Sequence, residues 1–367
     1  MESTLYQTIT KAIKTSIDRG ELLPGSKIPS VNELRKQYGV SHITAVRVYK
    51  ELTNMHYIQS KRGCGYFVAP RPMTGIRSFS GRIGNFLRPL RAYNQTDNYF
   101  NSINFAVQDE CYKLHLDLLG SHVTLPLSYP PYGEATLHSI IEAILNMNAE
   151  VDGFLLDERI PDELLEPVLP RLTKPLIIVN RTSRLPVVTA TQPNRAGMLA
   201  ILEASGKFGY GSYIFGEMSR GSQNELERRA AFYEYLKLHQ VSPERVRTID
   251  QCGILPPEQT EKKLEDAVSE LKQHGDRILF VASSDHVGRH IADYLLQHYG
   301  NFRQIGVVSF NGFELAFRSP VLATVRTDPV QLGILAVRKL QSLLTAPERR
   351  QSLNITTEVN FILGDTL

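Results

Sequence analysis

Three short helical patterns followed by a hairpin, all within the first 70 residues, constrain the fold of this 367-residue chain more than any other feature. In the first pattern an apolar residue recurs at every fourth position from Leu5 to Ile17, the spacing of one helical face. A second helix is expected to begin after Ser30, which forms a capping box with Glu33. The buried face of this second helix is expected to consist of Leu34 and Tyr38.

The third pattern begins after Ser41, a good N-cap, and Val40 precedes it as a hydrophobic staple. One face of this helix is apolar and is expected to pack inward through Ala45, Val48, Tyr49 and Leu52. A hairpin follows over residues 58–68, and its tip carries Lys61, Arg62 and Gly63. Three short helices closed by a basic, glycine-tipped hairpin predict a winged helix-turn-helix, a shape that fits the grooves of DNA.

Positive charge is concentrated on this small N-terminal part. Residues 1–72 hold 11 Lys and Arg against 5 Asp and Glu, a net charge of +6. The rest of the chain holds 30 against 33, a net charge of −3. Because phosphate binding needs local positive charge, the distribution agrees with the helix pattern and favours a nucleic-acid partner.

The third helix supplies the candidates for reading base pairs, because the first turn of a recognition helix lies nearest the base edges. Arg47 is suited either to guanine or to a phosphate, and the sequence leaves both open. A solvated polar face is the plain alternative, but Ile43 and Val46 fit it poorly and are suited to thymine methyl groups. The residues expected to contact DNA are Ser30, Asn32, Ser41, His42, Thr44, Arg47, Lys50, Lys61, Arg62 and Gly63.

Residues 4–69 resemble the GntR family of bacterial regulators. The family's turn motif corresponds to residues 20–30, its Glu-Leu pair to 33–34, its Val-Ser pair to 40–41 and its wing to 63–68. The chain departs from the family's usual arginines at three positions, which hold Asn32, His42 and Val46. The resemblance implies a winged-helix fold and DNA binding, and the departures imply a different preferred base sequence.

A segment punctuated by Pro and Gly predicts a linker at residues 70–81, between domains at 1–69 and 82–367. In the larger domain, short apolar runs alternate with amphipathic stretches, which predicts parallel sheets covered by helices. The predicted strands are 83–87, 123–127, 153–156, 176–179, 187–190, 212–215, 246–249, 278–281 and 305–309. The predicted helices include 135–146, 195–208, 225–238, 260–273 and 286–298. So long an α/β segment predicts two lobes with a ligand cleft at the carboxyl ends of their strands.

This larger domain is similar to the sugar-binding region of LacI/GalR-type repressors, itself similar to periplasmic sugar-binding proteins. The similarity lies in segments 151–156, 174–181, 227–232, 281–285, 305–311 and 320–325. The family's Asn-Asp pair is Ser284-Asp285 here, and its Asp-Asp pair is Asn311-Gly312. The resemblance implies an effector-binding and dimerisation domain, and the same fusion of two domains occurs in arabinose-responsive repressors of Bacillus.

Sugars are bound by planar, bidentate polar groups and by apolar ring faces, and residues suited to this follow several predicted strands. Arg228 corresponds to the family's ligand-contacting Arg, although Arg229 is adjacent and only one of them can point inward. Asp285 is expected to bind the ligand and also to cap the next helix. Tyr99 is suited equally to a sugar ring and to core packing. The expected effector-binding residues are Tyr99, Asp157, Arg181, Arg228, Asp285 and Asn311.

Other functional classes find little support in the sequence. Phosphate-loop, dinucleotide, nucleophile-elbow and zinc-protease motifs are lacking, so neither an enzyme nor a cofactor or metal site is expected. The sequence has no apolar run of about 18 residues, and its three cysteines lie far apart. A cytosolic protein is therefore expected. We therefore predict a homodimeric repressor of carbohydrate-utilisation genes that binds an operator in double-stranded DNA and responds to a monosaccharide. A sugar phosphate or purine effector, or a non-regulatory sugar-binding protein, are the alternatives.

Overall fold

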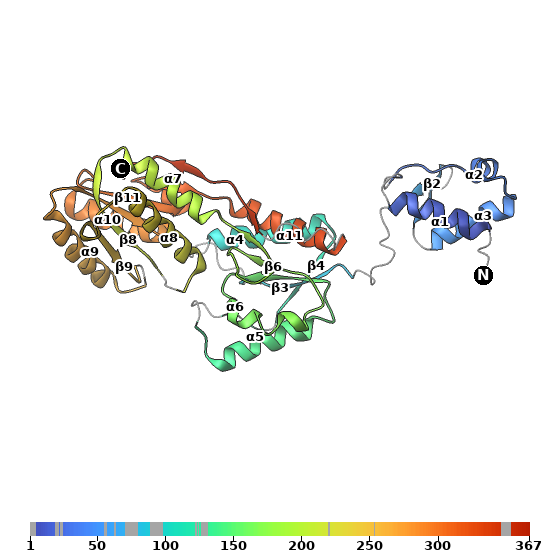
Figure 1. The fold of residues 1–367 in the computed structure, drawn as a ribbon, viewed down its shortest axis with the longest axis horizontal. Coiled ribbons are helices and arrows are strands. Elements are labelled where there is room, and N and C mark those ends of the chain that lie inside the picture. Colours follow the sequence, from blue (N-terminus) through green and yellow to red (C-terminus); the bar gives the residue numbers. More distant parts are fainter. Residues whose placement is uncertain are drawn as a thin grey trace. The chain divides into compact units, whose positions relative to one another are not determined.

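The computed structural model divides the chain into two compact units, Met1–Phe79 and Ser80–Leu367 (Figure 1). The structure describes residues 5–18, 22, 25–54, 57–61, 64–69, 80–88, 98–121, 123, 125, 131–218, 221–252, 254–345 and 354–367. Arg62 and Gly63 at the predicted hairpin tip, and residues 70–79 of the predicted linker, lie outside the described residues.

The first unit contains three helices and a two-stranded antiparallel hairpin. The helices are α1 (Leu5–Asp18), α2 (Val31–Tyr38) and α3 (His42–Asn54), and the strands are β1 (Ile58–Lys61) and β2 (Gly65–Val68). Ser30 and Glu33 form the predicted capping box, with each side chain accepting a hydrogen bond from the other residue's backbone N–H. The predicted inner face of α3 is confirmed, since Ala45, Val48, Tyr49 and Leu52 are at most 1% exposed.

One predicted core position of this unit, Tyr38, is wrong, and the apolar face predicted for the first helix is buried only in part. Leu5, in the first turn of α1, is 60% exposed, whereas Ile9 and Ile17 on the same helix are buried. Tyr38, the last residue of α2, is 37% exposed, so Leu34 alone is the buried residue of that helix. Both exposed side chains lie at a helix end.

The second unit is built from two six-stranded sheets, here called the first and second lobes. The first-lobe sheet has the order β13-β7-β6-β5-β3-β4 and the second-lobe sheet the order β14-β12-β11-β10-β8-β9. The first-lobe strands are β3 (Arg82–Phe86), β4 (Asp117–Gly120), β5 (Gly153–Asp157), β6 (Leu176–Val179), β7 (Val188–Thr191) and β13 (Asn354–Thr356). The second-lobe strands are β8 (Tyr210–Gly216), β9 (Val246–Ile249), β10 (Arg277–Ala282), β11 (Ile305–Asn311), β12 (Ala323–Arg326) and β14 (Asn360–Ile362).

Helices cover both faces of each sheet, as Figure 1 shows for α4 and α11 on one face of the first lobe and α5 and α6 on the other. The α-helices are α4 (Asn98–Lys113), α5 (Glu134–Met147), α6 (Asp162–Leu165), α7 (Asn194–Gly206), α8 (Gln223–Leu238), α9 (Pro257–Lys272), α10 (Asp285–Tyr299) and α11 (Pro329–Thr345). Three short 3-10 helices complete the described elements: η1 (Leu169–Arg171), η2 (Pro243–Arg245) and η3 (Glu314–Phe317).

Strand β10 shows why the strands of this unit are apolar at nearly every position of their sequences. Ile278, Phe280 and Ala282 pack in the core beneath α9 and α10. Leu279 and Val281, which point the opposite way, pack in the core beneath α7 and α8. A parallel sheet covered on both faces buries both sets of side chains, so its strands are apolar throughout instead of alternating. The predicted α/β architecture is thus confirmed.

The chain passes between the lobes at three places, which lie between β7 and α7, between β12 and α11, and between β13 and β14.

Not all strand predictions succeed. Val123 and Leu125, inside the predicted strand 123–127, have no strand structure, and the neighbouring strand is β4 instead. The final strand, β14, pairs with β12 antiparallel, a departure from the parallel pattern elsewhere in the sheet.

Candidate DNA-binding and effector sites

The first turns of α3 present the residues predicted to read base pairs. Ser41 caps the helix, because its Oγ accepts a hydrogen bond from the Thr44 backbone N–H at 3.1 Å. The hydroxyls of Ser41 and Thr44 are also 2.8 Å apart and bonded to each other. His42 is exposed beside them, and Ile43 is 80% exposed. The local sequence therefore builds a capped helix whose free face carries both polar and apolar groups.

Arg47 is held by a residue of α1. Its guanidinium carbon lies 3.9 Å from the centre of the Tyr6 ring, and its Nη2 donates a 3.2 Å hydrogen bond to the Tyr6 hydroxyl. The arginine remains exposed. A guanidinium fixed in this way is pre-positioned for a phosphate, because it keeps its charge and loses little side-chain freedom on binding.

The other predicted DNA contacts lie around this helix. Asn32, Lys50 and Lys61 are exposed, as phosphate-binding groups must be. Lys61, at the end of β1, has its Nζ 4.8 Å from the centre of the Phe67 ring. Ser30 is exposed but its hydroxyl is used in the capping box of α2.

In the second unit, Arg228 of α8 lies in a buried polar network where the two lobes meet. It is 3% exposed. Its Nε donates to Asn194 Oδ1 at 2.9 Å, its Nη1 to the Ser283 carbonyl at 2.5 Å, and its Nη2 to Gln192 Oε1 and Asn311 Oδ1, both at 3.1 Å. Its neighbour Arg229 instead pairs with Glu217 at 3.0 Å. Of the two adjacent arginines, Arg228 is thus the one that points inward.

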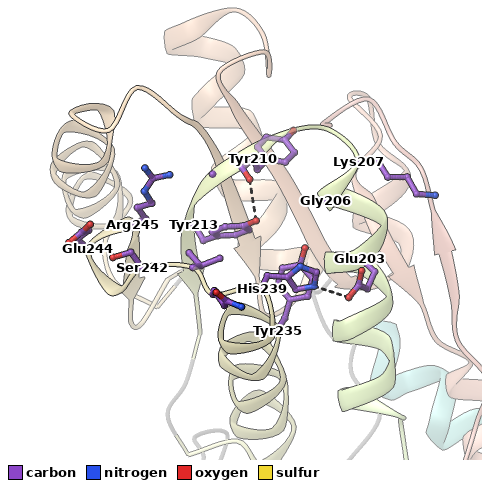
Figure 2. Close-up of a pocket in the computed structure, with 13 residues that line it drawn as sticks. Glu203, Gly206, Lys207, Tyr210, Tyr213, Tyr235, His239, Ser242, Glu244 and Arg245 are labelled. Atoms are coloured by element: carbon purple, nitrogen blue, oxygen red, sulfur yellow. Dashed lines mark hydrogen bonds and ion pairs between the residues drawn. The ribbon is translucent and has the colours of Figure 1, made fainter.

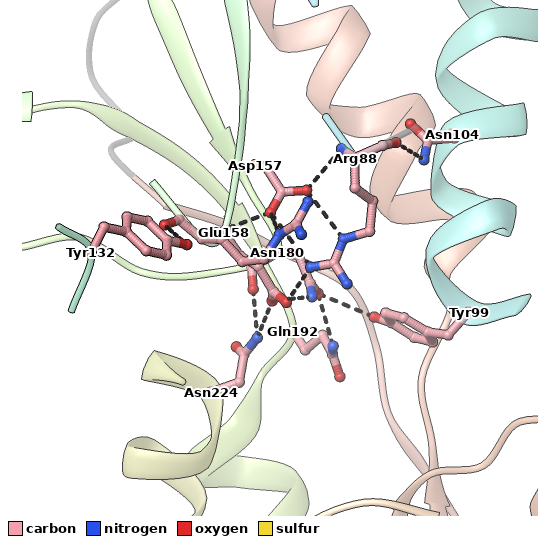
Figure 3. Close-up of polar contacts among 10 residues, drawn as sticks. Arg88, Tyr99, Asn104, Tyr132, Asp157, Glu158, Asn180, Gln192 and Asn224 are labelled. Carbon is pink, nitrogen blue, oxygen red and sulfur yellow. Dashed lines mark hydrogen bonds and ion pairs between the residues drawn. The ribbon is translucent and has the colours of Figure 1, made fainter. Parts of the chain in front are cut away.

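Glu158 joins the lobes (Figure 3). Its Oε2 accepts hydrogen bonds from Asn180 Nδ2 at 2.6 Å and from Asn224 Nδ2 at 2.9 Å. Asn180 follows β6 of the first lobe, whereas Asn224 belongs to α8 of the second. Asn224 Nδ2 also donates to the Asn180 carbonyl at 2.6 Å. Separating the lobes would therefore break a set of buried hydrogen bonds to a carboxylate, which are stronger than neutral ones.

Asp157, the last residue of β5, is held between two arginines. Its carboxylate accepts from Arg159 Nε at 2.8 Å, from Arg88 Nε at 3.2 Å and from the backbone N–H groups of both residues. Burial opposes ionisation of this carboxyl, but the two guanidinium groups and their hydrogen bonds outweigh it and hold its pKa well below the ordinary range. Asp157 is therefore a carboxylate that organises the site.

Asp285 is buried in the second lobe among neutral donors. Its carboxylate accepts from the hydroxyls of Ser309 at 2.6 Å and Thr324 at 2.9 Å, and from the Phe313 backbone N–H at 2.8 Å. Burial raises the pKa of Asp285 to about 6, although these hydrogen bonds act in the opposite direction. The predicted capping role is wrong, because Ser284 is the N-cap of α10 and accepts from the Val287 N–H.

The remaining predicted effector residues differ in their surroundings. Tyr99 is buried, donates a 3.2 Å hydrogen bond to Asn180 Oδ1 and meets the edge of the Phe313 ring from the other lobe. Asn311 ends β11 with a φ of 114° and accepts from Arg228. Arg181 turns back into the first lobe, where it bonds to the Ile160 carbonyl at 2.6 Å and pairs with Asp162 at 2.7 Å. The structure thus brings Tyr99, Arg228 and Asn311 together around one network and points Arg181 elsewhere.

Several members of the network were not among the predicted site residues. They are Arg88, Glu158, Asn180, Gln192, Asn194 and Asn224. Asn180 and Gln192 each come directly after a strand, so the rule that selected Asp285 and Asn311 would also have found them. Asn224 and Asn194 lie at helix starts, and sequence spacing gives no signal that they face the cleft.

Beside the network, between Arg88, Phe100, Asp157 and Asn180, lies a cavity of about 10 Å³, room for about one water molecule. A larger groove of about 770 Å³ lies elsewhere, around Tyr213, Tyr235 and His239 (Figure 2). This groove is at the amino-terminal end of β8, whereas ligands of open α/β sheets bind at the carboxyl ends of the strands. The polar network, and not the groove, therefore has the position expected of an effector site.

The chain thus combines a winged helix-turn-helix with a two-lobed domain of the periplasmic-binding-protein type. Comparison with known proteins agrees for each part. Residues 5–68 match the model of the family described as bacterial regulatory proteins, gntR family. The first unit is a GntR-family helix-turn-helix domain, as predicted from its sequence.

Curated relatives match over this first unit. Over 68 residues the chain is 41% identical to the arabinose metabolism transcriptional repressor of Halalkalibacterium halodurans, covering 18% of each chain. Over 64 residues it is 34% identical to the mannosyl-D-glycerate transport/metabolism system repressor of Escherichia coli, covering 17% of this chain and 27% of that one. The chain therefore spans about a fifth to a quarter of the length of these relatives.

Solved structures match the second unit. The lac repressor dimer, solved with operator and the anti-inducer ONPF, is similar with a TM-score of 0.64 and 19% identity, over 79% of this chain and 94% of that one. A LacI family regulator of Enterococcus faecium with bound ribose has a TM-score of 0.61 and 14% identity, over 78% and 98% of the two chains. These likenesses establish that the second unit has the LacI-type fold.

Within the residues that the structure describes, no helix has the length and apolarity needed to span a membrane.

Asp285→Asn is expected to remove a pH dependence from the unfolding free energy of the full chain. The folded state keeps the Asp285 proton up to about pH 6, whereas an unfolded aspartic acid loses it near a pKa of about 3.9. Stability contributed by this group is therefore present at low pH and is lost between about pH 4 and pH 6, by up to ~3 kcal/mol. Urea unfolding at several pH values measures it, with Asp266→Asn on the exposed face of α9 as the control. Parallel curves for the wild type and Asp285→Asn would contradict the expectation.

Proposed function

We propose that this protein is a sequence-specific DNA-binding transcription regulator that represses carbohydrate-utilisation genes and changes its DNA affinity when a small sugar binds between the lobes. The observation that carries the proposal is the union of two parts in one chain. A GntR-family helix-turn-helix domain precedes a LacI-type domain whose buried network lies at the carboxyl ends of the strands. Such a regulator acts in the cytoplasm, where bacterial DNA lies.

The network supplies the chemistry that a sugar needs. Arg228, Asn311 and Gln192 offer planar groups for adjacent hydroxyls, and Tyr99 and Phe313 offer aromatic surface. The cavity beside Arg88 and Asp157 is too small for a sugar, so we expect the side chains of the network to move apart when a ligand binds. Glu158 and Asn224 hold the lobes together, so exchanging their hydrogen bonds for those of a sugar would bias the lobe arrangement. Repressors of sugar metabolism among the relatives support this class of effector.

An effector with a negatively charged group is the second candidate, and one observation favours it. Among the described residues of the second unit, the buried arginines are Arg159, Arg181, Arg228 and Arg289. Arg159, Arg181 and Arg289 each lie within ion-pair distance of an aspartate. Among the described residues, Arg228 instead has only neutral acceptors at hydrogen-bond distance. A sugar phosphate would give Arg228 a directly bonded anion, in addition to the longer-range attraction of Glu225, Glu158 and Asp285.

We further propose that the regulator is a homodimer, because two DNA-binding heads reading two half-sites give an operator with matching symmetry. The similar lac repressor structure contains a dimer. On α4, Phe105 and Tyr112 lie two turns apart and are 53% and 82% exposed, which suits a face covered by a second copy. A measurement of the mass of the full chain in solution tests this proposal, because a dimer has twice the mass of one chain.

The function is tested with the full chain in two steps. An operator is first selected from a pool of random double-stranded DNA. Thermal melts then screen pentoses, hexoses, deoxyhexoses, their phosphates and purines, and any stabilising compound is tested for release of the operator. A saturating ligand at a hundred times its Kd stabilises the protein by about 2.7 kcal/mol, which a melt detects. Failure to select any preferred sequence would reject the regulator, and a response to purines alone would reject the sugar.

Arg47→Ala is expected to weaken operator binding by about 1–3 kcal/mol while the thermal response to the effector is unchanged. The physical reason is loss of a positioned phosphate contact from the exposed face of α3. Tyr6→Phe is the matched variant, because it removes the hydroxyl that accepts from Arg47 but keeps the ring beneath it. Fluorescence anisotropy with labelled operator measures the operator affinity of both variants. Equal affinities of Arg47→Ala and the wild type would show that this arginine does not contact DNA.

A further inference from the structure

An exposed apolar pair lies on the recognition helix α3. Ile43 is 80% exposed and Val46 is 41% exposed. Residues three apart in a helix are neighbours on one face, so the two side chains form one apolar surface beginning at the first turn. They stand out in a domain whose sequence is otherwise rich in positive charge, with a net charge of +6 over residues 1–72. Neither side chain contributes to the core below, which Ala45, Val48 and Tyr49 fill.

Two polar side chains beside this pair, those of Thr44 and Arg47, make contacts within the protein. The Thr44 hydroxyl is bonded to the Ser41 hydroxyl at 2.8 Å, and Ser41 also caps the helix. The Arg47 guanidinium lies over the Tyr6 ring and donates to its hydroxyl. Threonine and arginine are two residue types that read bases through hydrogen bonds, and here one hydrogen bond of each is already used within the protein. Ile43 and Val46 are exposed on the same helix.

We propose that Ile43 and Val46 read thymine, by packing against the 5-methyl groups of thymines in the major groove of each operator half-site. This inference rests on the proposed function and adds which base is recognised and how. Thymine is the base that presents a methyl group in the major groove, and apolar side chains recognise it by contact. The basic surface around the pair attracts the phosphates, while the pair itself can only make apolar contacts. Sequence preference therefore comes in part from methyl groups.

Replacing thymine by uracil removes the methyl group and leaves the hydrogen-bonding edge of the base unchanged, so it isolates this contact. The full chain is used, with an operator selected from random DNA and uracil then placed at one thymine position at a time. Burial of one methyl-sized group corresponds to about a fourfold change in Kd. We expect uracil to weaken binding about fourfold at each contacted thymine.

Variants assign the effect to the two side chains. Ile43→Ala and Val46→Ala remove exposed groups and are not expected to disturb folding. Each should bind thymine and uracil operators about equally at the position that it normally contacts. Lys50→Ala, on the same helix and exposed, should weaken both operators by the same factor.

The failure of this inference is distinguishable from failure of the proposed function. A selected operator that binds equally well with uracil at every position would overturn thymine reading and leave the regulator intact. Continued discrimination of thymine from uracil by both alanine variants would likewise overturn the assignment to Ile43 and Val46. If no DNA sequence is selected at all, the proposed function itself fails, and thymine reading fails with it.

Discussion

Arg228→Ala is expected to abolish the response to effector while operator binding remains as tight as in the wild type. The guanidinium lies where the lobes meet and donates to Asn194, Gln192, Asn311 and the Ser283 carbonyl. In the proposed complex, some of these hydrogen bonds are exchanged for bonds to the ligand. Each hydrogen bond to a charged group is worth about 1.5–3 kcal/mol. Loss of two such bonds raises the effector Kd by more than about a hundredfold.

Thermal melts with and without effector measure this loss, and operator release by the effector is measured in parallel. Arg195→Ala is the matched control, because Arg195 lies on neighbouring α7 and forms an exposed ion pair with Glu234. Exposed ion pairs contribute little to the stability of a protein, so the Arg195→Ala variant should keep the full effector response. If the Arg228→Ala protein melts as the wild type does and still responds to the effector, Arg228 is not part of the effector site. Loss of operator binding as well would instead indicate misfolding.

The choice between Arg228 and Arg229 shows what sequence reasoning achieves. The strand and helix pattern placed both residues on one helix beside the cleft, and helical geometry required that only one point inward. The correspondence with LacI/GalR-type sequences selected Arg228, and the structure buries Arg228 and leaves Arg229 partly exposed beside Glu217. Short apolar runs and patterns with a period of about 3.6 residues thus predicted most strands and helices, because they reflect which faces are buried.

The missed features are contacts between residues far apart in the chain. Arg47 and Tyr6 are 41 positions apart, and Glu158 and Asn224 are 66 apart. Neither pair produces a local pattern, because the partners meet only after the helices or lobes have packed. The mistaken cap at Asp285 has the same origin. Its carboxylate is drawn to Ser309 and Thr324 on adjacent strands, which leaves the cap to Ser284.

Asp157→Asn is expected to destabilise the second unit more than any other single change to the network. The carboxylate lies between Arg88 and Arg159, with side chains that are 12% and 2% exposed. Replacing it by an amide removes the carboxylate that both guanidinium groups share, although Arg88 keeps its ion pair with Glu158. Removal of one partner from a buried ion pair costs about 3–5 kcal/mol. For a domain of this size the midpoint of the melt should fall on the order of 10 °C.

Asp109→Asn is the matched control, since Asp109 pairs with Lys113 on the exposed face of α4 and both side chains are more than half exposed. It should change the melt by less than about 1 °C. The pH dependence provides a second test. Because the two arginines lower the pKa of Asp157, its stabilisation is present at pH values above its unfolded pKa of about 3.9 and is lost as the pH falls below that value. The difference between wild type and Asp157→Asn should therefore shrink on acidification below about pH 4, and a constant difference would show that ion pairing is not its source.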